Sequence, residues 1–342
     1  MSFSVGIVGL PNVGKSTLFK ALTKKQVDIA PYPFTTIHPN FGVVSVPDER
    51  LEKISEVIKS EKVTPTIIEF VDIAGLVKGS HKGEGLGNQF LAQIKNCDAI
   101  LLVLRCFADP KVENVLGEIN PEKEIEIVKV ELLMKDLETL ENSISKMEKK
   151  KDKKTLRKIE ILKKIKIGVS QEKLISEIGL TNEEKEEMKE YQFLTQKPIF
   201  YILNINQKTP YLISEIKHLE INLKEEDEIS ELSESEIKEL GLKSQLDQLI
   251  ISCYNILDLI TFYTVAGLKE TKAWTLKRGL RAPEAGGIVH SDFRERFIRA
   301  EVIPWQKLVE AGSWSKAREK GWLQIVGKDY IVKDGDVIEF KI

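Results

Sequence analysis

Short runs of apolar, often β-branched residues recur along the chain and are separated by more polar segments. Runs of this length and composition are typical of buried strands, and those without alternation indicate strands of a parallel sheet. The segment behind the first run, residues 16–23, has the spacing of a helix. The pattern predicts an α/β fold with strands at residues 3–8, 66–71, 98–104 and 197–204.

A different pattern begins at Glu124, where apolar residues recur at steps of three and four, as in a heptad seam. A second apolar stripe follows a basic run at residues 149–154. We expect an antiparallel helical hairpin over residues 124–191, inserted into an α/β domain of residues 1–123 and 192–258. The basic run at its bend is either a solvated tip or a contact for RNA phosphates. The predicted seam holds Val130, Leu133, Leu137, Leu140, Ile144 and Met147, and the second stripe holds Leu156, Ile159, Leu162 and Ile165.

The last part of the chain, residues 259–342, has the pattern of a small α+β module. Apolar residues alternate around Asp334 and Gly335, and an Asp-Gly pair in this setting indicates a turn between strands. The module holds 15 Lys and Arg against 11 Asp and Glu, a net charge of +4. Such a module permits contact with RNA without requiring it, and it has no aromatic motif for stacking on bases.

Composition narrows the class of protein further. The 342 residues suffice for two or three domains, 42% of them are apolar, and the net charge of −2 gives no general attraction to nucleic acid. Cys97, Cys106 and Cys253 share no metal-ligand spacing, and their odd number argues against a disulfide framework. No charged and then apolar leader precedes Phe3, and no apolar run approaches membrane length. We expect a cytoplasmic protein without a membrane partner.

The chemistry begins at Gly9-Leu-Pro-Asn-Val-Gly-Lys-Ser-Thr17, which satisfies the phosphate-loop pattern G-x-x-x-x-G-K-[ST] between the first strand and the first helix. Glycines allow the backbone N–H groups to turn toward phosphate oxygens, and the helix N-terminus adds a partial positive charge. Lys15 is expected to reach the β- and γ-phosphates, and the Ser16 hydroxyl to bind Mg²⁺. The predicted nucleotide contacts in this loop are Asn12, Val13, Gly14, Lys15, Ser16 and Thr17.

Two further segments are expected to sense the γ-phosphate. Residues 30–39 contain three prolines and read as an extended loop, in which Thr35 and Thr36 are both candidates to complete the Mg²⁺ shell. Asp72-Ile-Ala-Gly75 follows a predicted strand, so that Asp72 supports the Mg²⁺ shell and the Gly75 N–H contacts the γ-phosphate. Leu76 stands where a water-orienting Gln is expected. Hydrolysis must therefore use another group or remain slow until a partner assists.

The base is predicted from the end of the last apolar run. A GTPase would carry N-K-x-D there, with the Asp accepting the hydrogen bonds that guanine offers, but this chain has Asn204-Ile-Asn-Gln207 and no N-K-x-D elsewhere. Without that Asp a site cannot favour guanine strongly. ATP is therefore the expected nucleotide.

These motifs together resemble the YchF, or Obg-like ATPase, family along the whole chain. The residues that carry the resemblance are the phosphate loop, Tyr32-Pro-Phe-Thr-Thr-Ile37, Phe70-Val-Asp-Ile-Ala-Gly-Leu-Val-Lys-Gly79, Gly85-Leu-Gly-Asn88, Leu104-Arg-Cys-Phe107, Ala273-Trp-Thr-Leu, Phe297-Ile-Arg-Ala-Glu301 and Gly327-Lys-Asp-Tyr-Ile-Val-Lys-Asp-Gly-Asp336. The resemblance implies an α/β P-loop NTPase with a Ras-like G domain of the OBG type, a helical coiled-coil insertion and a C-terminal TGS (β-grasp) domain. It also implies a Mg²⁺-dependent ATPase that binds the ribosome as a monomer, with RNA contacts through the TGS and helical domains.

The resemblance also assigns single residues. It selects Thr36 over Thr35 as the second Mg²⁺ ligand and places Asn204 and Ile205 at the adenine. It puts Lys224 in a loop packing on the base. Three positions depart from the family: Gln207 replaces a Glu, Asn114 replaces a proposed catalytic His, and His38 replaces a Glu.

The leading hypothesis is a ribosome-associated ATPase switch, in which ATP and Mg²⁺ order residues 30–39 and 72–88 and hydrolysis releases them. A GTPase of the Obg type and a binding module with little intrinsic hydrolysis are the alternatives. A P-loop kinase for a small metabolite is a further reading, but the sequence shows no second cluster of anion-binding Arg residues.

Overall fold

The computed structural model describes residues 3–24, 40–73, 86–148, 152–206 and 216–342. These residues belong to two compact units. We call residues 4–42 and 69–246 the P-loop unit, and residues 1–3, 43–68 and 247–342 the C-terminal unit. The predicted segment 30–39, with Thr36, lies outside the described residues, as does Gln207. Of the predicted segment 72–88, residues 74–85 lie outside them, with Gly75 and Leu76.

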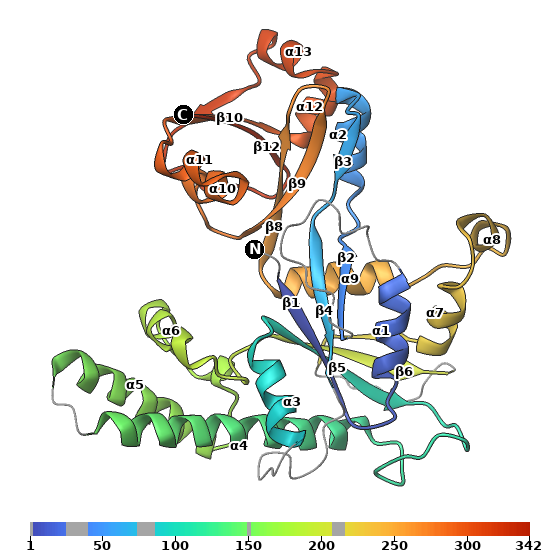
Figure 1. Cartoon of the computed structure of the whole chain (residues 1–342), viewed down its shortest axis with the longest axis vertical. Coiled ribbons are helices and arrows are strands. Elements are labelled where there is room, and N and C mark those ends of the chain that lie inside the picture. Colours follow the sequence, from blue (N-terminus) through green and yellow to red (C-terminus); the bar gives the residue numbers. More distant parts are fainter. Residues whose placement is uncertain (1–2, 25–39, 74–85, 149–151, 207–215) are drawn as a thin grey trace. The chain divides into compact units, whose positions relative to one another are not determined.

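A six-stranded sheet carries the phosphate loop (Figure 1). Its strand order is β2-β4-β1-β5-β6-β7, and from β4 to β7 all neighbours are parallel. Every residue of β5 is buried, as its continuous apolar run predicts. Parallel pairing brings the carboxyl ends of the strands to one edge, where ligands bind in sheets of this kind. The strands are β1 (Ser4–Val8), β2 (Phe41–Ser45), β4 (Ile67–Asp72), β5 (Ala99–Cys106), β6 (Ile199–Ile205) and β7 (His218–Ile221).

Short helices connect these strands. Helix α1 (Lys15–Lys24) starts directly at the phosphate loop and buries Leu18, Ala21 and Leu22. Helix α7 (Leu223–Ile229) follows β7, and the Asn222 side chain caps it by accepting a hydrogen bond from the Glu225 N–H. Helices α3 (Leu86–Lys95) and α8 (Glu234–Glu239) complete this set.

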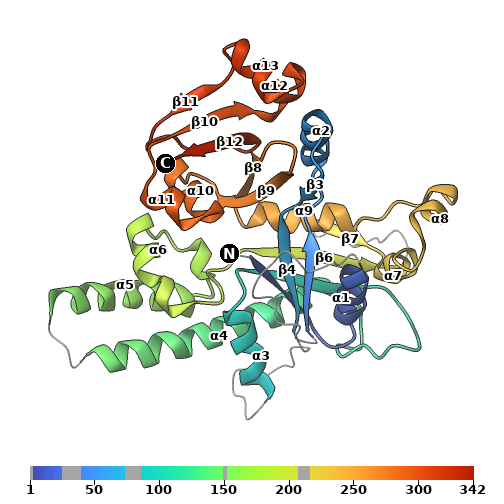
Figure 2. The same cartoon turned by 45° about the horizontal axis from the view of Figure 1, so that its top comes forward.

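The predicted hairpin is present as α4 (Pro121–Met147) and α5 (Lys153–Ser170), which run side by side in Figures 1 and 2. Asn120 and Asp152 cap the two N-termini, and proline at the first position suits the start of α4. Two short 3-10 helices, Ile175–Glu177 and Lys189–Tyr191, flank α6 (Asn182–Met188) and close the segment. The shared core holds Leu133, Leu140, Ile144, Ile161, Leu162 and Ile165.

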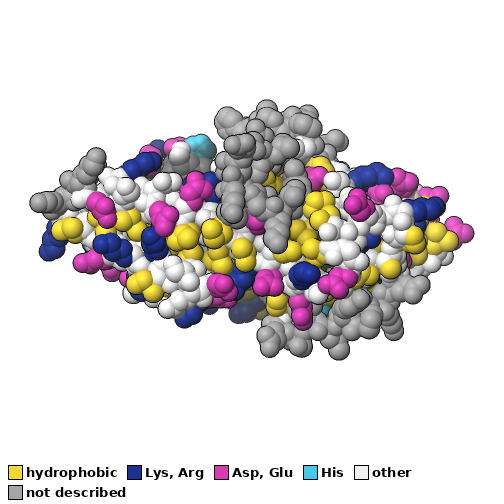
Figure 3. All heavy atoms as spheres, turned by 90° about the horizontal axis from the view of Figure 1, so that it is seen from below, with side chains coloured by type: hydrophobic (Ala, Val, Ile, Leu, Met, Phe, Trp, Pro, Cys, Tyr) yellow, Lys and Arg dark blue, Asp and Glu magenta, His cyan; other side chains and the backbone are white. Residues whose placement is uncertain are grey.

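The predicted register of this hairpin is wrong at the first residue of each apolar stripe. Val130 is 42% exposed and Leu156 is 49% exposed. Near its start α4 meets β5, where the Arg105 N–H donates to Glu124. Val128 and Leu132 are buried on this stretch, and Val130 between them is exposed. Figure 3 shows one face of the molecule, on which hydrophobic side chains lie among acidic and basic ones.

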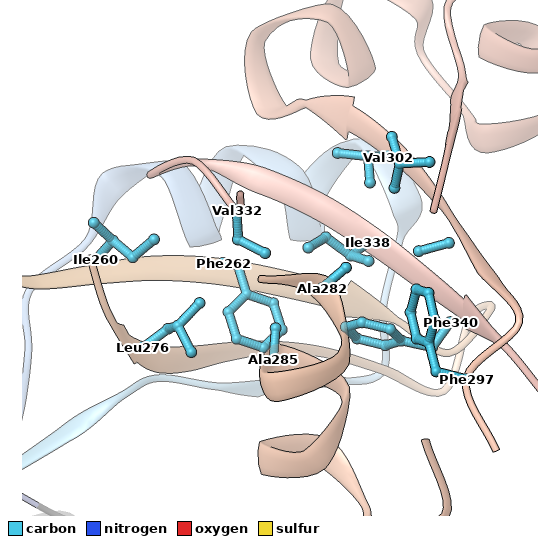
Figure 4. Packing of buried hydrophobic residues seen from close by; sticks show 12 residues of the cluster. Ile260, Phe262, Leu276, Ala282, Ala285, Phe297, Val302, Val332, Ile338 and Phe340 are labelled. Carbon is cyan, nitrogen blue, oxygen red and sulfur yellow. The ribbon is translucent and has the colours of Figure 1, made fainter. Parts of the chain in front are cut away.

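The C-terminal unit is an α+β structure on a second six-stranded sheet of order β11-β10-β12-β8-β9-β3. Its core contains Phe262, Leu276, Phe297, Ile338 and Phe340, which Figure 4 shows in close packing with Ala282 and Ala285 of α10. The strands are β3 (Lys62–Thr64), β8 (Leu259–Val265), β9 (Glu270–Lys277), β10 (Arg299–Pro304), β11 (Gln324–Val326) and β12 (Asp336–Lys341). The helices are α2 (Glu49–Ile58), α9 (Leu246–Ile256), α10 (Ala282–Val289), α11 (Ser291–Glu295), α12 (Trp305–Ala311) and α13 (Trp314–Glu319).

The predicted turn at Asp334 and Gly335 exists, and Gly335 has φ +89°. Only the segment after it is a strand, β12, because Ile331 on the other side makes just an isolated bridge to Arg281. Within the described residues, no helix combines the length and apolar character that a membrane span requires.

Residues 43–68 belong to the C-terminal unit, although this range begins within β2 and ends within β4, two strands of the first sheet. Leu51, Ile54 and Ile58 of α2 enter a core cluster with Tyr263 and Val337, and β3 pairs with β9. No pattern in the sequence predicts this arrangement. The division at residue 259 therefore stays a prediction.

Candidate nucleotide-binding site

The phosphate loop, residues 9–17, depends on two glycines. Gly9 has φ +158°, and a Cβ there would lie 2.5 Å from the Val103 carbonyl oxygen. Gly14 has φ +106°, and its Cβ would lie 2.5 Å from Asn204 Nδ2. Any larger residue would push the loop away from its neighbours, so these positions keep the backbone close enough to surround a phosphate.

Lys15, Ser16 and Asp72 meet at the start of α1. Lys15 is nearly buried, and its Nζ donates to the Leu10 carbonyl oxygen at 2.8 Å. The Ser16 hydroxyl donates to Asp72 Oδ2 at 3.1 Å. Burial lowers the pKa of Lys15, while Asp72 and Glu124 oppose that shift. Burial likewise raises the pKa of Asp72, against the hydrogen bond from Ser16 and the charge of Lys15.

This donor set fits Mg²⁺. A hydroxyl and a carboxylate are hard oxygen ligands, and Mg²⁺ usually adds substrate phosphates and waters to one or two such groups. Among the described residues no three His, Cys, Asp or Glu side chains gather as a metal cluster. The other predicted ligand, Thr36, lies outside the described residues.

A pocket of about 1100 Å³ extends from the loop across the ends of β5, β6 and β7. Its volume suits a nucleotide. Of the predicted residues, Asn12, Gly14, Lys15, Ser16, Thr17, Asn204 and Ile205 line it. Phe107, Ala108, Asp109, Val112, Asn206, Leu223 and Lys224 line it as well.

Asn204 is fixed by both ends of its amide. Its Nδ2 donates to the Val13 carbonyl at 2.8 Å, and its Oδ1 accepts from the Leu223 N–H at 3.2 Å. Asn204 is buried, so these bonds satisfy groups that water does not reach. The side chain thus ties the phosphate loop to the first turn of α7.

The expected place of Lys224 was wrong in one respect. The residue lines the pocket, but it lies in the first turn of α7 and not in a loop. Asn222 begins this helix by capping it, which the sequence reading did not include.

Asn114 closes its own turn. Its Nδ2 donates to the Glu118 carbonyl at 2.8 Å, and its Oδ1 accepts from the Leu116 N–H at 3.0 Å. Asn114 is not among the residues that line the pocket. An amide held in this way is no proton acceptor for hydrolysis.

Sequence reasoning missed Arg105 and Glu124 as parts of the site. Arg105 is 3% exposed near the end of β5, and its guanidinium binds the carbonyls of Phe107, Val112 and Glu113. Its N–H donates to Glu124 Oε2 at 3.1 Å, and burial raises the pKa of Glu124 to about 7. An Arg that ends a fully apolar strand was the available signal, since a buried Arg needs partners.

The strand, glycine loop and helix at the edge of a parallel sheet, with an Asp from the neighbouring strand beside the loop, define a P-loop NTPase domain of the GTPase type. A family model described as "50S ribosome-binding GTPase" matches residues 4–157. The model of the YchF GTPase C-terminal domain, described as "Protein of unknown function (DUF933)", matches residues 259–342.

Full-length relatives agree with both matches. The "Ribosome-binding ATPase YchF" of Bacillus subtilis (strain 168) is 43% identical and aligns over 100% of this chain and 99% of its own. The protein of the same name from Escherichia coli O157:H7 is 43% identical over 99% of each chain. The structure of the Schizosaccharomyces pombe YchF GTPase, 32% identical, superposes with a TM-score of 0.87 over 99% of this chain and 98% of that one. The chain belongs to the YchF family.

Proposed function

We propose that the protein binds ATP with Mg²⁺, hydrolyses it, and acts on the ribosome as a switch linked to translation. The observation that carries this proposal is the meeting of Lys15, Ser16 and Asp72 at one end of a nucleotide-sized pocket. The relatives' name, "Ribosome-binding ATPase", supports the activity and the partner.

The residues divide the work by position. The Lys15 ammonium neutralises the β- and γ-phosphates, and the backbone N–H groups of residues 12–17 surround them. Ser16 and Thr36 would hold Mg²⁺, with Asp72 supporting its shell, and the ion would supply further positive charge to the phosphates. The Gly75 N–H senses the γ-phosphate. Leu76 cannot orient water by hydrogen bonding, so the intrinsic rate is slow and a partner accelerates it.

Adenine is the proposed base. Asn204 uses both ends of its amide on protein groups, and the motif that reads guanine is missing from the sequence. A site without that Asp offers guanine N1 and N2 no matched acceptor, and therefore has no strong preference for GTP. The GTPase alternative predicts the opposite order of affinities.

The proposed partners follow from the family. The ribosome, through its large subunit or as a whole, is the principal partner, and RNA contacts lie in the TGS domain, residues 259–342, and in the helical domain, residues 124–191. We propose a cytoplasmic monomer whose G domain consists of residues 1–123 and 192–258.

The test compares ATP and GTP hydrolysis, with and without ribosomes, in the wild type and in Lys15→Ala. We expect ATP to bind more tightly than GTP, ribosomes to raise the ATPase rate, and Lys15→Ala to lose hydrolysis, because Lys15 supplies the cation of the phosphate loop. Lys163→Ala is the control, since Lys163 is an exposed lysine of α5 that does not line the pocket. Normal turnover in Lys15→Ala, or a strong preference for GTP, would contradict the assignment.

A second candidate, a ribosome-binding module that uses nucleotide without notable hydrolysis, is favoured by the closed turn of Asn114. Sedimentation with ribosomes separates the two. Binding that does not change between ATP and no nucleotide supports the module, and binding that depends on ATP supports the switch.

A further inference from the structure

One wall of the pocket is a loop to which a single buried side chain, that of Arg105, donates three hydrogen bonds. This wall loop, residues 107–113, contributes Phe107, Ala108, Asp109 and Val112 to the lining. The guanidinium of Arg105 donates to the carbonyls of Phe107 at 3.3 Å, Val112 at 2.8 Å and Glu113 at 2.8 Å.

The wall loop is also joined to the two other sides of the pocket. Asn12 of the phosphate loop donates to the Glu113 carbonyl at 3.3 Å, next to the bond from Arg105. Asn206, at the end of β6, donates to the Ala108 carbonyl at 3.1 Å. The guanidinium carbon lies 4.5 Å from the centroid of the Phe107 ring. The position of the wall therefore depends on Arg105 more than on any one neighbour.

Helix α4 fixes Arg105 in turn. Glu124, in the first turn of α4, is 1% exposed and accepts the backbone N–H of Arg105 at 3.1 Å. The same helix continues for 27 residues as one side of the hairpin. The first turn of α4 is thus bonded to the residue that organises the pocket wall.

The wall loop is bonded through Asn206 to residues 204–206, where the base is expected, and we call this the base end of the pocket. We propose that Arg105 is a positioning residue for this base end, and that Glu124 couples it to α4, so that the state of the helical hairpin changes nucleotide affinity. The proposal rests on the proposed function, since it concerns the same pocket. Coupling of this kind is reciprocal. If bound nucleotide stabilises the start of α4, then a change that stabilises the start of α4 raises the affinity for nucleotide by the same factor.

Arginine is required here for a geometric reason. Its planar group presents five N–H donors in a fixed fork and so reaches three carbonyls at once, whereas a lysine ammonium is a compact point charge. Arg105→Lys keeps the charge and loses the fork. The wall then loses hydrogen bonds while the phosphate end, built by the loop and Lys15, remains.

The first experiment measures dissociation constants for ATP and for inorganic tripolyphosphate, which has no base. In Arg105→Lys we expect the value for ATP to rise about tenfold, the size of one or two lost hydrogen bonds. The value for tripolyphosphate should change by less than about twofold. Equal changes for both ligands, or none for ATP, would overturn the proposal. A wild type that binds neither ligand would instead refute the proposed function.

A companion variant protects this test from a folding defect. Asn206 is exposed, and its side chain donates to the Ala108 carbonyl of the wall loop. Asn206→Ala removes this hydrogen bond. Asn206→Ala should raise the dissociation constant for ATP, as Arg105→Lys does, and leave that for tripolyphosphate unchanged. This result is expected even if Arg105→Lys does not fold. An unchanged ATP affinity in Asn206→Ala together with an unfolded Arg105→Lys counts against the proposal.

The second experiment tests the link to α4 with a matched pair. Glu124→Gln retains a carbonyl oxygen that accepts the Arg105 N–H, and Glu124→Ala does not. Amide hydrogen exchange should show that ADP slows exchange in both residues 107–113 and residues 124–132 of the wild type and of Glu124→Gln. In Glu124→Ala the protection of 124–132 should disappear, and the dissociation constant for ATP should rise. Protection of α4 that is absent from the wild type, or retained in Glu124→Ala, would refute the coupling.

Discussion

At the scale of single residues, the site depends on glycines, which have no side chain, as well as on the side chains that bind. Gly14 combines a backbone conformation that other residues rarely adopt with a neighbour that leaves no room for a Cβ. That neighbour, Asn204, cannot move aside freely because its amide bonds both Val13 and Leu223. Strain at Gly14 would therefore reach the phosphate loop and α7 together.

A matched pair of substitutions separates the two effects. Gly14→Ala should destabilise the fold by about 2–3 kcal/mol and remove nucleotide binding, because it adds a clash to an unfavourable φ. Gly117 has a positive φ of +74°, but a Cβ added there would meet no other atom within 4 Å. Gly117→Ala should therefore cost about 1 kcal/mol of stability and leave nucleotide binding intact. Thermal unfolding and nucleotide titration of both variants check this. Equal binding by the two would show that Asn204 yields to the new methyl group.

The site residues that the sequence predicts belong to one contiguous motif, whereas those that it misses are joined to residues far away in the sequence. Lys15 and Ser16 are fixed by a contiguous pattern, so a reader can assign them without a structure. The role of Arg105 arises from the path of residues 107–113, which contain no regular element and no diagnostic spacing. Its partner Glu124 lies 19 positions away on another element. Pairings of this kind are set by tertiary packing, which no local pattern encodes.

At the scale of elements, α4 has two partners along its length. Near its start it contacts β5, and further along it packs on α5 through Leu140 and Ile144. A seam drawn at heptad spacing assumes one partner throughout and so misplaces Val130. The existence and order of the strands and of the hairpin could be read from apolar periodicity. The register could not, because the partner of each turn is unknown from sequence.

The corrected register makes a quantitative prediction. Leu140 is fully buried in the hairpin core, so Leu140→Ala should cost about 3 kcal/mol, whereas Val130→Ala should cost about 0.5 kcal/mol. The four tryptophans all lie in the C-terminal unit, so native-state amide exchange in α4 and α5 is the suitable measurement. The original seam predicts comparable losses for the two variants, and such a result would restore it.

At the scale of the whole molecule, the C-terminal unit is assembled from distant parts of the sequence. Asp48 caps α2 and accepts a hydrogen bond from the Tyr263 hydroxyl at 2.5 Å, while Arg50 binds both Asp48 and Asp334. In sequence, residues 43–68 lie between the two segments expected to sense the γ-phosphate, 30–39 and 72–75. A family match that begins at residue 259 does not contain this contribution. Composition and periodicity could not have revealed it, since α2 reads as an ordinary amphipathic helix.

Removal of residues 259–342 should therefore harm what remains. A fragment of residues 1–258 keeps α2 but loses the partners of Leu51, Ile54 and Ile58, and the edge of β3 loses β9. Exposed apolar faces and unpaired strand edges favour aggregation. We expect this fragment to bind a hydrophobic dye, to form oligomers in size-exclusion chromatography and to unfold at lower temperature than the full chain.

The reverse experiment gives the control. A fragment of residues 259–342 should gain thermal stability when a peptide of residues 43–68 is added, because α2 and β3 complete its core cluster and its sheet. A scrambled peptide of the same composition should have no effect. If residues 1–258 were instead monomeric and as stable as the full chain, the packing of α2 on Tyr263 and Val337 would contribute little, and a boundary at residue 259 would describe two independently folding parts.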